Sequence, residues 1–494
     1  MSGQAGPGEE QAHREEASAL AGLGTTLRRV HFVGIGGIGM SALAEVMHGQ
    51  GYDVSGSDLR PSPLIARLRG LGFPVDIPHR FELAHEADLV VRSAAIPDRN
   101  PEVEAARRRG VAVVRRGTML AALTRGYTAI AVTGTHGKST TSSMVAVMLA
   151  ECGVDPTVVV GARVPAFGSN ARVGRRDYFV VEADESEPSL LALNPRVAVL
   201  TNLEEEHLEQ YGSFGTLQDT IVSFANLVPS NGTLVWCADD PVLGRLRSRF
   251  LVPQVSYGLS ADETDIRGDD LRFEAAGSRC LVRCPAEIHP EPFHLEVGVP
   301  GRHNLLNALG ALTVGLTLGL PVSRLLPALS SFEGVERRFQ LKGEVGQVRV
   351  IDDYAHHPTE VLAVLETARR QPHERLVVLF QPHRYSRVRQ FIDRFGDALS
   401  EADLIVLTDV YAAGEPIEAD ASLERLASRI ETRSRRPVQP APTVDDAARV
   451  ASELARPGDL VLTLGAGSIG EAGDLILDRL RSQAGQGPVT GNKV

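Results

Sequence analysis

The chain has 494 residues, a length that predicts about three domains, since one domain usually holds about 100 to 200 residues. Hydrophobic residues make up 43% and charged residues 23%, a balance that excludes a disordered or fibrous protein. The formal net charge of -11 argues against nucleic-acid binding, because phosphates attract basic chains. The 4 cysteines include no C-x-x-C pair, which excludes a disulfide framework and favours a cytoplasmic location.

Both ends of the chain, residues 1–27 and 483–494, are predicted to be disordered tails because they lack the apolar periodicity of packed elements. The start, MSGQAGPGEEQAHREE, has no apolar region of the kind that directs secretion. The most apolar window, Leu305–Leu320, is shorter than the roughly 20 residues of a membrane span. We therefore expect no membrane insertion, and we interpret this window as a buried helix.

Between the tails, short apolar runs alternate with helical stretches, which is typical of βαβ units on parallel sheets. Residues 28–123 contain the strand-like runs VHFVG, DVSGSD, LVVRSA and VAVVRR. Residues 124–331 contain YTAIAVTG, VDPTVVVG, DYFVVEAD and RVAVLTN, followed by the apolar helix. Residues 332–482 contain VRVIDDYA, RLVVLFQ, ADLIVLTDVY and DLVLTLGAG. We therefore predict three α/β domains with these boundaries.

The first domain carries a glycine-rich loop with the spacing G-x-G-x-x-G at Gly34, Gly36 and Gly39, and Asp58 follows about 20 residues later. Such a loop lets the backbone approach a pyrophosphate, which both NAD and UDP contain. An NAD-dependent oxidoreductase is therefore one interpretation. The same spacing recurs in residues 465–470, where we favour a structural turn over a nucleotide contact.

A third glycine loop, TGTHGKST in residues 133–140, lies between an apolar strand and a helix. Its G-x-x-G spacing is shorter than that of the common phosphate-binding loop, but it ends in the same G-K-S. Backbone amides can surround phosphate oxygens there, Lys138 can reach the β and γ phosphates, and Ser139 can bind Mg²⁺. We predict that ATP binds to Gly134, Thr135, His136, Gly137, Lys138, Ser139 and Thr140.

Acidic side chains follow two strands of the second domain. Glu182 ends the run YFVVE, and Glu204–Glu206 with His207 follow the run AVLTN. Because the carboxyl ends of parallel strands face the ligand crevice, Glu182 and His207 are expected to converge on Lys138. Mg²⁺ prefers oxygen ligands, so we predict a site made by Ser139, Glu182 and His207. A solvated acidic helix start is an equally good interpretation of Glu204–Glu206.

Four motifs in fixed order, TGTHGKST, EADESE, TNLEEEH and GRHNLLNA, resemble those of the Mur ligases of peptidoglycan synthesis. The resemblance implies an ATP-dependent, amide-forming enzyme with three domains. These would be a Rossmann-like UDP-binding domain, a central P-loop ATPase-like α/β domain and a C-terminal Rossmann-like α/β domain. The segments HFVGIGGIGMSALA, SGSD, RSAAIP, DDYAHHPTE, FQPHRYSR and VYAAGE resemble the members that use L-alanine.

The reaction that this resemblance implies needs ATP and Mg²⁺. ATP would phosphorylate the lactyl carboxylate of UDP-N-acetylmuramate, and the amine of L-alanine would attack the acyl phosphate, giving UDP-N-acetylmuramoyl-L-alanine, ADP and phosphate. One alternative is the recycling ligase that adds a murein tripeptide to the same UDP-sugar. An NAD-dependent oxidoreductase remains the alternative of another class, although it leaves Lys138 without a role. We expect a cytoplasmic monomer or weak homodimer.

The resemblance also implies roles for individual residues. UDP-sugar binding is expected of Gly34, Gly36, Gly37, Gly39, Asp58, Ser93 and Asn202. Nucleotide contacts are expected of Asn304, Asn307, Arg338 and Asp352. The amino acid is expected at Tyr354, Arg384 and Arg387, because two guanidinium groups can clamp its carboxylate. Catalytic roles are expected of Lys138, Glu182, His207 and His356.

Overall fold

The computed structural model describes residues 16, 20, 23, 26–80, 84–175, 177–186, 188–206, 208–418 and 421–485. His207 and most of the two predicted tails lie outside these residues. The chain divides into two compact units. Unit 1 extends to Asp270 and includes Cys280–Glu296 and Leu306–Phe332. Unit 2 contains Leu271–Arg279, Val297–Leu305 and the chain from Glu333 onward.

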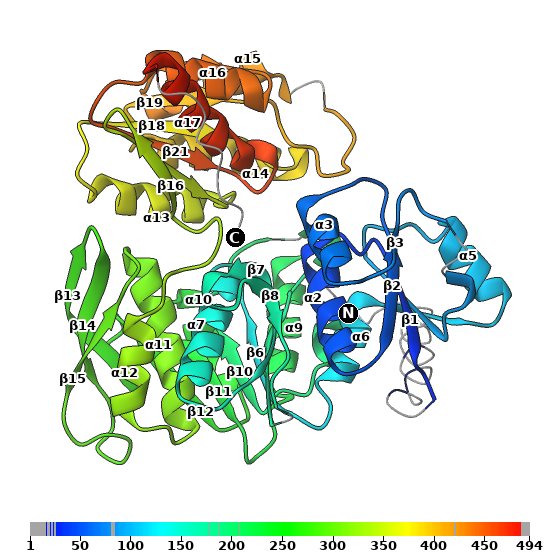
Figure 1. Cartoon of the computed structure of the whole chain (residues 1–494). Helices are drawn as coiled ribbons and strands as arrows, with labels where there is room; N and C mark the ends of the chain where they lie inside the picture. Colours follow the sequence, from blue (N-terminus) through cyan, green and yellow to red (C-terminus); the bar gives the residue numbers. More distant parts are fainter. Residues whose placement is uncertain are drawn as a thin grey trace. The chain divides into compact units, whose positions relative to one another are not determined.

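The first sheet has five strands, all parallel, in the order β3-β2-β1-β4-β5 (Figure 1). Its strands are β1 (Arg29–Val33), β2 (Asp53–Ser57), β3 (Val75–Asp76), β4 (Leu89–Arg92) and β5 (Ala112–Arg115). The helices of this region are α2 (Ile38–Gly49), α3 (Pro63–Gly70), α5 (Pro101–Arg108) and α6 (Arg116–Leu123). The strand order reverses between β1 and β4, so the loop after β1 lies at a topological switch point, where ligands bind in such folds.

The second sheet has ten strands in the order β15-β14-β13-β12-β11-β10-β6-β9-β7-β8. They are β6 (Thr128–Thr133), β7 (Thr157–Val164), β8 (Ser169–Arg172), β9 (Tyr178–Glu182), β10 (Val197–Leu200), β11 (Thr233–Cys237), β12 (Gln254–Gly258), β13 (Ile266–Glu274), β14 (Gly277–Arg283) and β15 (Phe293–Val297). Strands β10, β6 and β9 are parallel neighbours. Their apolar runs are buried almost throughout, as expected of parallel strands covered on both faces.

Helices surround this sheet and include the predicted apolar helix. They are α7 (Lys138–Glu151), α8 (Leu208–Tyr211), α9 (Phe214–Ala225), α10 (Pro241–Leu246), α11 (Arg302–Thr317) and α12 (Val322–Ser330). Short 3₁₀ helices are η2 (Pro165–Phe167), η3 (Pro188–Ala192) and η4 (Arg247–Arg249). Helix α11 confirms the helix predicted from the window at Leu305, and its apolar residues Leu305, Leu309 and Leu312 are fully buried.

The third sheet, in unit 2, has six strands in the order β16-β17-β21-β18-β19-β20. They are β16 (Gln340–Val345), β17 (Val348–Asp353), β18 (Arg375–Phe380), β19 (Leu404–Leu407), β20 (Val438–Pro440) and β21 (Asp459–Leu464). Only β16 runs antiparallel to its neighbour. The helices are α13 (Pro358–Arg369), α14 (Tyr385–Leu399), α15 (Leu423–Ser434), α16 (Val444–Leu454), η6 (Ser468–Glu471) and α17 (Ala472–Gln483). Two apolar clusters form its core, built around Phe380 and Val461.

The fold confirms the predicted α/β class and the twelve strand-like runs named above. The sequence analysis did not identify β11 to β15, which extend the second sheet. Strands β13 and β14 alternate buried and exposed positions and are joined by Ala275 and Ala276 alone. Such half-exposed strands carry a much weaker apolar signal than fully buried parallel strands.

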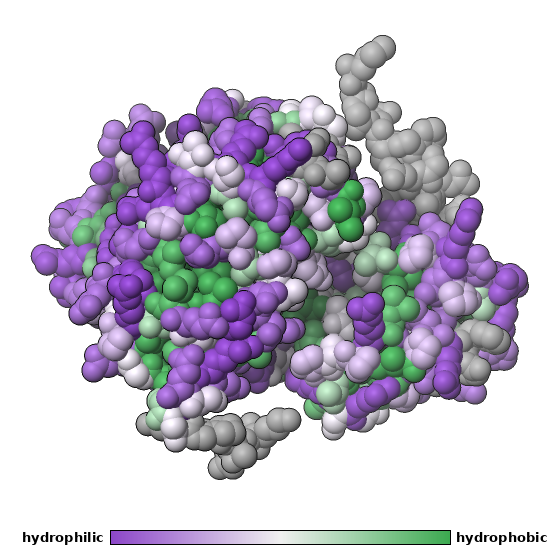
Figure 2. All heavy atoms as spheres, turned by 90° about the horizontal axis from the view of Figure 1, so that it is seen from above, coloured by the Kyte–Doolittle hydropathy of each residue, from purple (hydrophilic) through white to green (hydrophobic). Residues whose placement is uncertain are grey.

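The surface carries mainly hydrophilic side chains on the face drawn in Figure 2, with apolar residues between them. The most exposed large apolar side chains among the described residues are far apart in sequence, namely Leu59, Leu251, Leu341 and Ile417. Scattered apolar residues of this kind are normal for a folded protein. No helix in the described part of the chain has both the length and the hydropathy needed to cross a membrane.

Candidate active site

The first glycine loop follows β1 and is held by the end of β2. The N–H groups of Gly34 and Ile35 both donate to the carbonyl oxygen of Ser57, over 2.9 and 3.0 Å. The N–H of Gly36 donates to Asp58 Oδ2 over 2.9 Å. A Cβ added at Gly34 would lie 3.3 Å from the Cβ of Ser93. The structure therefore brings together the loop, Asp58 and Ser93, as predicted.

The loop leads into helix α2, whose N-terminus is open. Gly37 is the N-cap, and no side chain caps the first amides of the helix. A Cβ added at Gly39 would lie 2.9 Å from Nη1 of Arg116, so a guanidinium lies beside this helix start. Uncapped amides and a nearby positive charge are what a pyrophosphate needs. All four predicted glycines thus lie at one uncapped helix start.

A buried polar network lies directly behind this loop. The Ser57 hydroxyl donates to Glu102 Oε2 over 2.5 Å and lies 2.8 Å from Nδ1 of His79. A hydroxyl has one hydrogen, so His79 must donate to Ser57 through Nδ1. Burial acts to raise the pKa of Glu102, but its contacts with His31 and Ser57 outweigh burial and lower it. The network fixes Ser57, whose carbonyl oxygen in turn fixes the glycine loop.

The phosphate loop connects β6 to helix α7. Gly134 and Gly137 have φ values of +134° and +79°, which side chains with a Cβ rarely adopt. A Cβ at Gly137 would lie 2.6 Å from Oδ1 of Asn307, so helix α11 approaches the loop closely at this point. Gly137 is the N-cap of α7, again without a capping side chain. Ser139 and Thr140 follow in the first turn and are buried.

The segment after β10 holds the phosphate loop in place. Oδ1 of Asn202 accepts the N–H of His136 over 2.8 Å, and Nδ2 of Asn202 donates to the His136 carbonyl over 3.0 Å. The hydroxyl of Thr201 donates to the same carbonyl over 2.6 Å. Asn202 was predicted to bind substrate. Its contacts in the described structure go to the loop, and a substrate contact stays a prediction.

Glu182 is the last residue of β9 and pairs in register with Val132 of β6. Because β10, β6 and β9 are parallel neighbours, Glu182, the phosphate loop and Asn202 lie at the same carboxyl edge of the sheet. Oε2 of Glu182 accepts the N–H of Gly161 over 2.6 Å, which fixes the carboxylate. Glu182 thus lies at the sheet edge that carries the loop, whereas His207, which was expected to converge there with it, lies outside the described residues.

Lys138 is paired with an acid that the sequence analysis did not single out. Its Nζ lies 2.7 Å from Oε2 of Glu185, and the two side chains are 15% and 1% exposed. Burial acts to lower the pKa of Lys138, but attraction by Glu185 and Asp184 outweighs burial and raises it. Lys138 therefore carries its positive charge at neutral pH. Glu185 stands three residues after Glu182 in EADESE, a spacing that could have drawn attention to it.

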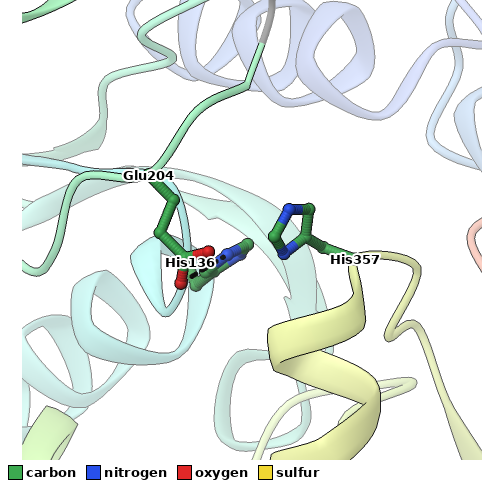
Figure 3. Close-up of side chains that lie close together, drawn as sticks. All are labelled: His136, Glu204 and His357. Atoms are coloured by element: carbon green, nitrogen blue, oxygen red, sulfur yellow. Dashed lines mark ion pairs between the residues drawn. The ribbon is translucent and has the colours of Figure 1, made fainter. Parts of the chain in front are cut away.

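His136 and Glu204 add a second polar pair beside the loop. Nε2 of His136 lies 3.6 Å from Oε1 of Glu204, an ion pair when the imidazole is protonated (Figure 3). The N–H of Glu204 donates to the hydroxyl of Thr135 over 2.8 Å. Figure 3 also labels His357, a residue of unit 2 that caps helix α13 by accepting the N–H of Thr359. The main chain of Glu204 thus contacts the phosphate loop, and a solvated acidic helix start stays one interpretation of Glu204–Glu206.

The residues present fit ATP and Mg²⁺. Two glycines with positive φ, an uncapped helix start and a charged lysine form a cradle for phosphates. The hydroxyl of Ser139 and the carboxylate of Glu182 are oxygen donors of the kind that Mg²⁺ prefers. His207, the third predicted ligand, lies outside the described residues.

In unit 2, several of the predicted site residues lie close to Tyr354. The guanidinium of Arg338 lies over the Tyr354 ring, 5.1 Å from its centre. The rings of Tyr354 and His356 lie 5.3 Å apart, edge to face. The ring centres of His383 and His356 lie 5.8 Å apart, and Nη1 of Arg387 lies 3.1 Å from Nδ1 of His383. Arg338, Tyr354, His356 and Arg387 therefore form one polar and aromatic group.

The other predicted residues of unit 2 have specific local partners. Arg384 is the N-cap of α14 and has φ +65°, a strained value for a residue with a Cβ. Asn304 donates to the carbonyl of Pro300 over 2.8 Å. Asp352 is 1% exposed, lies 2.9 Å from Nε of Arg337 and accepts the hydroxyl of Thr463 over 2.6 Å.

Asp353, beside Asp352, is a buried carboxyl that the sequence analysis did not select. It is 3% exposed and accepts the N–H groups of Phe339 and Ala355, each over 2.7 Å. Burial raises its pKa to about 6, although Arg338 acts in the opposite direction. Asp353 therefore organises the backbone that leads to Tyr354.

The glycine loop at the end of β21 is closely approached by side chains of the protein. A Cβ at Gly467 would lie 2.5 Å from Oε1 of Gln381 and 2.6 Å from the ring of Tyr411. A Cβ at Gly470 would lie 2.7 Å from the guanidinium of Arg337. Side chains of the protein itself fill the space above these glycines, which agrees with the structural interpretation of residues 465–470.

Family models match most of the chain. "Mur ligase family, catalytic domain" matches residues 29–128, "Mur ligase middle domain" residues 132–315 and "Mur ligase, glutamate ligase domain" residues 337–467. Two relatives named UDP-N-acetylmuramate--L-alanine ligase are similar along nearly their whole length. The one from Anaeromyxobacter sp. (strain Fw109-5) is 45% identical over 455 residues, and the one from Geobacter sp. (strain M21) is 44% identical over 465 residues. Each comparison covers 92% of this chain and 98% of the relative.

Solved structures show the same fold. The UDP-N-acetylmuramate-alanine ligase MurC from Thermotoga maritima is 29% identical, with a TM-score of 0.78 over 92% of this chain and 99% of that chain. A murein peptide ligase from Psychrobacter arcticus has a TM-score of 0.71 over 94% of this chain and all of its own. At 23% identity, this second likeness shows the fold alone.

Proposed function

The chain belongs to the Mur ligase family, and from this premise we propose that it joins L-alanine to the lactyl carboxylate of UDP-N-acetylmuramate, using ATP. The observation that carries the proposal is that the charged Lys138 of the GTHGK loop and the fixed Glu182 of β9 lie at one sheet edge. Relatives with 42–45% identity bear the alanine ligase name, so the tripeptide ligase is not favoured. The NAD-dependent oxidoreductase is not favoured either, because it would leave this loop without a role.

In the first step, an oxygen of the lactyl carboxylate attacks the γ phosphorus of ATP. A new O–P bond forms, the bond to the oxygen between the β and γ phosphorus atoms breaks, and ADP leaves. Both reactants are anions, so the step requires charge neutralisation and alignment. Lys138 and the loop amides supply positive charge at the phosphates. Mg²⁺, when bound, neutralises phosphate charge, and Ser139 and Glu182 would hold it, with His207 as the predicted third ligand.

In the second step, the amine of alanine attacks the carbonyl carbon of the acyl phosphate. A C–N bond forms, the C–O bond to phosphate breaks, and the nitrogen loses a proton. We assign that proton to Nε2 of His356, because Nδ1 of His356 lies 3.0 Å from the Tyr354 carbonyl and donates to it. Arg384 and Arg387 bind the alanine carboxylate in this proposal, since paired guanidinium groups recognise carboxylates.

Further assignments belong to the same proposal. The UDP group binds at the first glycine loop with Asp58 and Ser93. The ATP nucleotide contacts Asn304, Asn307, Arg338 and Asp352. We propose domains at residues 28–123, 124–331 and 332–482, and the three successive family matches, to residues 29–128, 132–315 and 337–467, support a division into three. The free thiols Cys152, Cys237, Cys280 and Cys284 support a cytoplasmic location, and we propose a monomer or weak homodimer.

The test is an omission assay in which phosphate release and product mass are measured together. We expect ADP, phosphate and UDP-N-acetylmuramoyl-L-alanine only when UDP-N-acetylmuramate, L-alanine, ATP and Mg²⁺ are all present. A parallel reaction replaces alanine with the murein tripeptide. Turnover with tripeptide but not with alanine would contradict the proposal, as would phosphate release that does not depend on the amino acid.

A further inference from the structure

Glu185 lies in the loop after β9 and is fixed by the main chain as well as by its side chain. The Tyr211 hydroxyl, from α8, donates to the main-chain carbonyl of Glu185. The carboxylate is 1% exposed and lies 2.7 Å from Nζ of Lys138. Nothing in the mechanism above uses this acid, although it contacts the residue on which the mechanism depends most.

The ammonium group of Lys138 has three hydrogens, and three oxygen atoms surround it, one in an ion pair and two in hydrogen bonds. Nζ lies 2.7 Å from Oε2 of Glu185, and it donates to the carbonyls of Gly134 over 2.7 Å and Thr135 over 3.1 Å. An ammonium has no fourth hydrogen. Contact between Lys138 and a phosphate oxygen therefore requires the exchange of at least one of these partners.

The three partners differ in what their loss would cost. A carbonyl that loses a hydrogen bond remains neutral. Burial raises the pKa of Glu185 to about 7 although Lys138 acts in the opposite direction, so a Glu185 that loses its cation must either remain an uncompensated buried charge or take up a proton. Breaking a buried ion pair is strongly destabilising for that reason. The exchange is therefore expected at Gly134 and Thr135, and the contact with Glu185 is expected to persist.

We propose that Glu185 is a positioning residue that holds the Lys138 ammonium in place before and after nucleotide binding, while phosphate oxygens replace the carbonyls of Gly134 and Thr135. The inference rests on the proposed function of the phosphate loop. Glu185 fixes where the positive charge lies, so the ammonium group can act on the γ phosphate without being displaced when its carbonyl partners are exchanged.

The first experiment compares Glu185→Gln and Glu185→Asp with wild type in the complete ligase reaction. Gln keeps the size of the side chain and removes its charge. We expect Glu185→Gln to lower kcat by about tenfold or more, with the KM for UDP-N-acetylmuramate changed by less than about twofold. Glu185→Asp retains the charge and should recover part of kcat. The matched control is Glu205→Gln, which changes an exposed acid in the segment after β10.

The second experiment follows Lys138 itself, without turnover. The chain has only three lysines, so acylation of Lys138 and Lys342 can be compared by mass spectrometry in one sample. In nucleotide-free wild type, we expect Lys138 to be acylated slowly relative to Lys342, because its partner Glu185 is buried whereas Asp474, the partner of Lys342, is exposed. Glu185→Gln should raise the relative rate at Lys138 by about threefold or more, and Glu205→Gln should leave it unchanged.

Normal kcat in Glu185→Gln would overturn the inference, as would an unchanged labelling ratio. An equal fall in kcat for the Asp and Gln variants would also count against it, because a general packing role would make both variants fail alike. Circular dichroism and the KM for the UDP-sugar report whether each variant is folded. If wild type makes no product in the omission assay, the proposed function fails, and the labelling ratio still reports on Glu185.

Discussion

At the scale of single residues, many predicted ligand contacts are already engaged with the protein. Asp58 accepts the Gly36 N–H, Asn202 holds His136, and Asp352 pairs with Arg337. These polar side chains fix the backbone of the loops in which the ligands are proposed to bind. Preorganised donors of this kind need not reorient when charge develops during the reaction, which is the main source of electrostatic catalysis.

The first prediction concerns Asp353 and pH. Its pKa in the folded protein is about 6, above the unfolded value near 3.8, so the folded state binds the proton more tightly. The stability that this provides is fully present below about pH 4 and is lost as pH rises to about 6. Asp353→Asn removes that loss. We expect the free energy of unfolding of the variant, relative to wild type, to increase between pH 4 and pH 6 and then stay level.

Urea denaturation at pH 4, 5, 6 and 7 measures this difference. A difference that is constant over the whole range would contradict the raised pKa. A difference that decreases with pH would mean that Arg338 dominates over burial.

At the scale of elements, both proposed phosphate sites lie where a strand meets a helix through glycine. The starts of α2 and α7 lack capping side chains, and each N-cap is a glycine. The four amides at the start of a helix then have no side-chain acceptor, so they favour an anion. The neighbours differ, however. Arg116 lies beside the first loop, whereas Lys138 lies within the second.

The second prediction uses two glycines with the same φ value at the two ends of α7. Gly137 and Gly153 both have φ +79°, but only at Gly137 would a Cβ meet another group, at 2.6 Å from Asn307 Oδ1. Replacing either by Ala should reduce the free energy of unfolding by about 1 to 2 kcal/mol, because the left-handed conformation is strained. Only Gly137→Ala should also displace the phosphate loop, and we expect its kcat to fall by about tenfold or more.

Steady-state kinetics and urea denaturation of the two variants check this pair. Gly153→Ala is the control for strain, since its added Cβ has open space around it. Equal kcat values in the two variants would show that the close approach of Asn307 does not matter for turnover.

At the scale of the whole molecule, the chain forms two compact units that each contain buried cores. Unit 1 holds the first glycine loop and the phosphate loop, and unit 2 holds the group around Tyr354. Residues 271–279 and 297–305 cluster with unit 2 although they lie within the sequence span of unit 1. A chain of this kind need not unfold in a single two-state step.

The third prediction is that UDP-N-acetylmuramate stabilises unit 1. At about 100 times its Kd, a ligand adds about 2.7 kcal/mol to the free energy of unfolding of the part that binds it. Differential scanning calorimetry should show two unfolding transitions. The transition whose midpoint changes in Asp353→Asn is that of unit 2. We expect the UDP-sugar to raise the other transition. If it raised only the transition that Asp353→Asn alters, the UDP site would have to lie in unit 2.

The sequence by itself determined the fold class, the order of the parallel strands along the chain and the three glycine loops. Buried parallel strands are continuous apolar runs, and phosphate loops need glycine at fixed spacing, so both are visible in one dimension. The half-exposed strands β13 and β14 and the acids Glu185 and Asp353 are not visible in this way. Only the tertiary structure decided which carboxylate is buried against Lys138, because burial and pairing depend on segments that are distant in sequence and meet at one sheet edge.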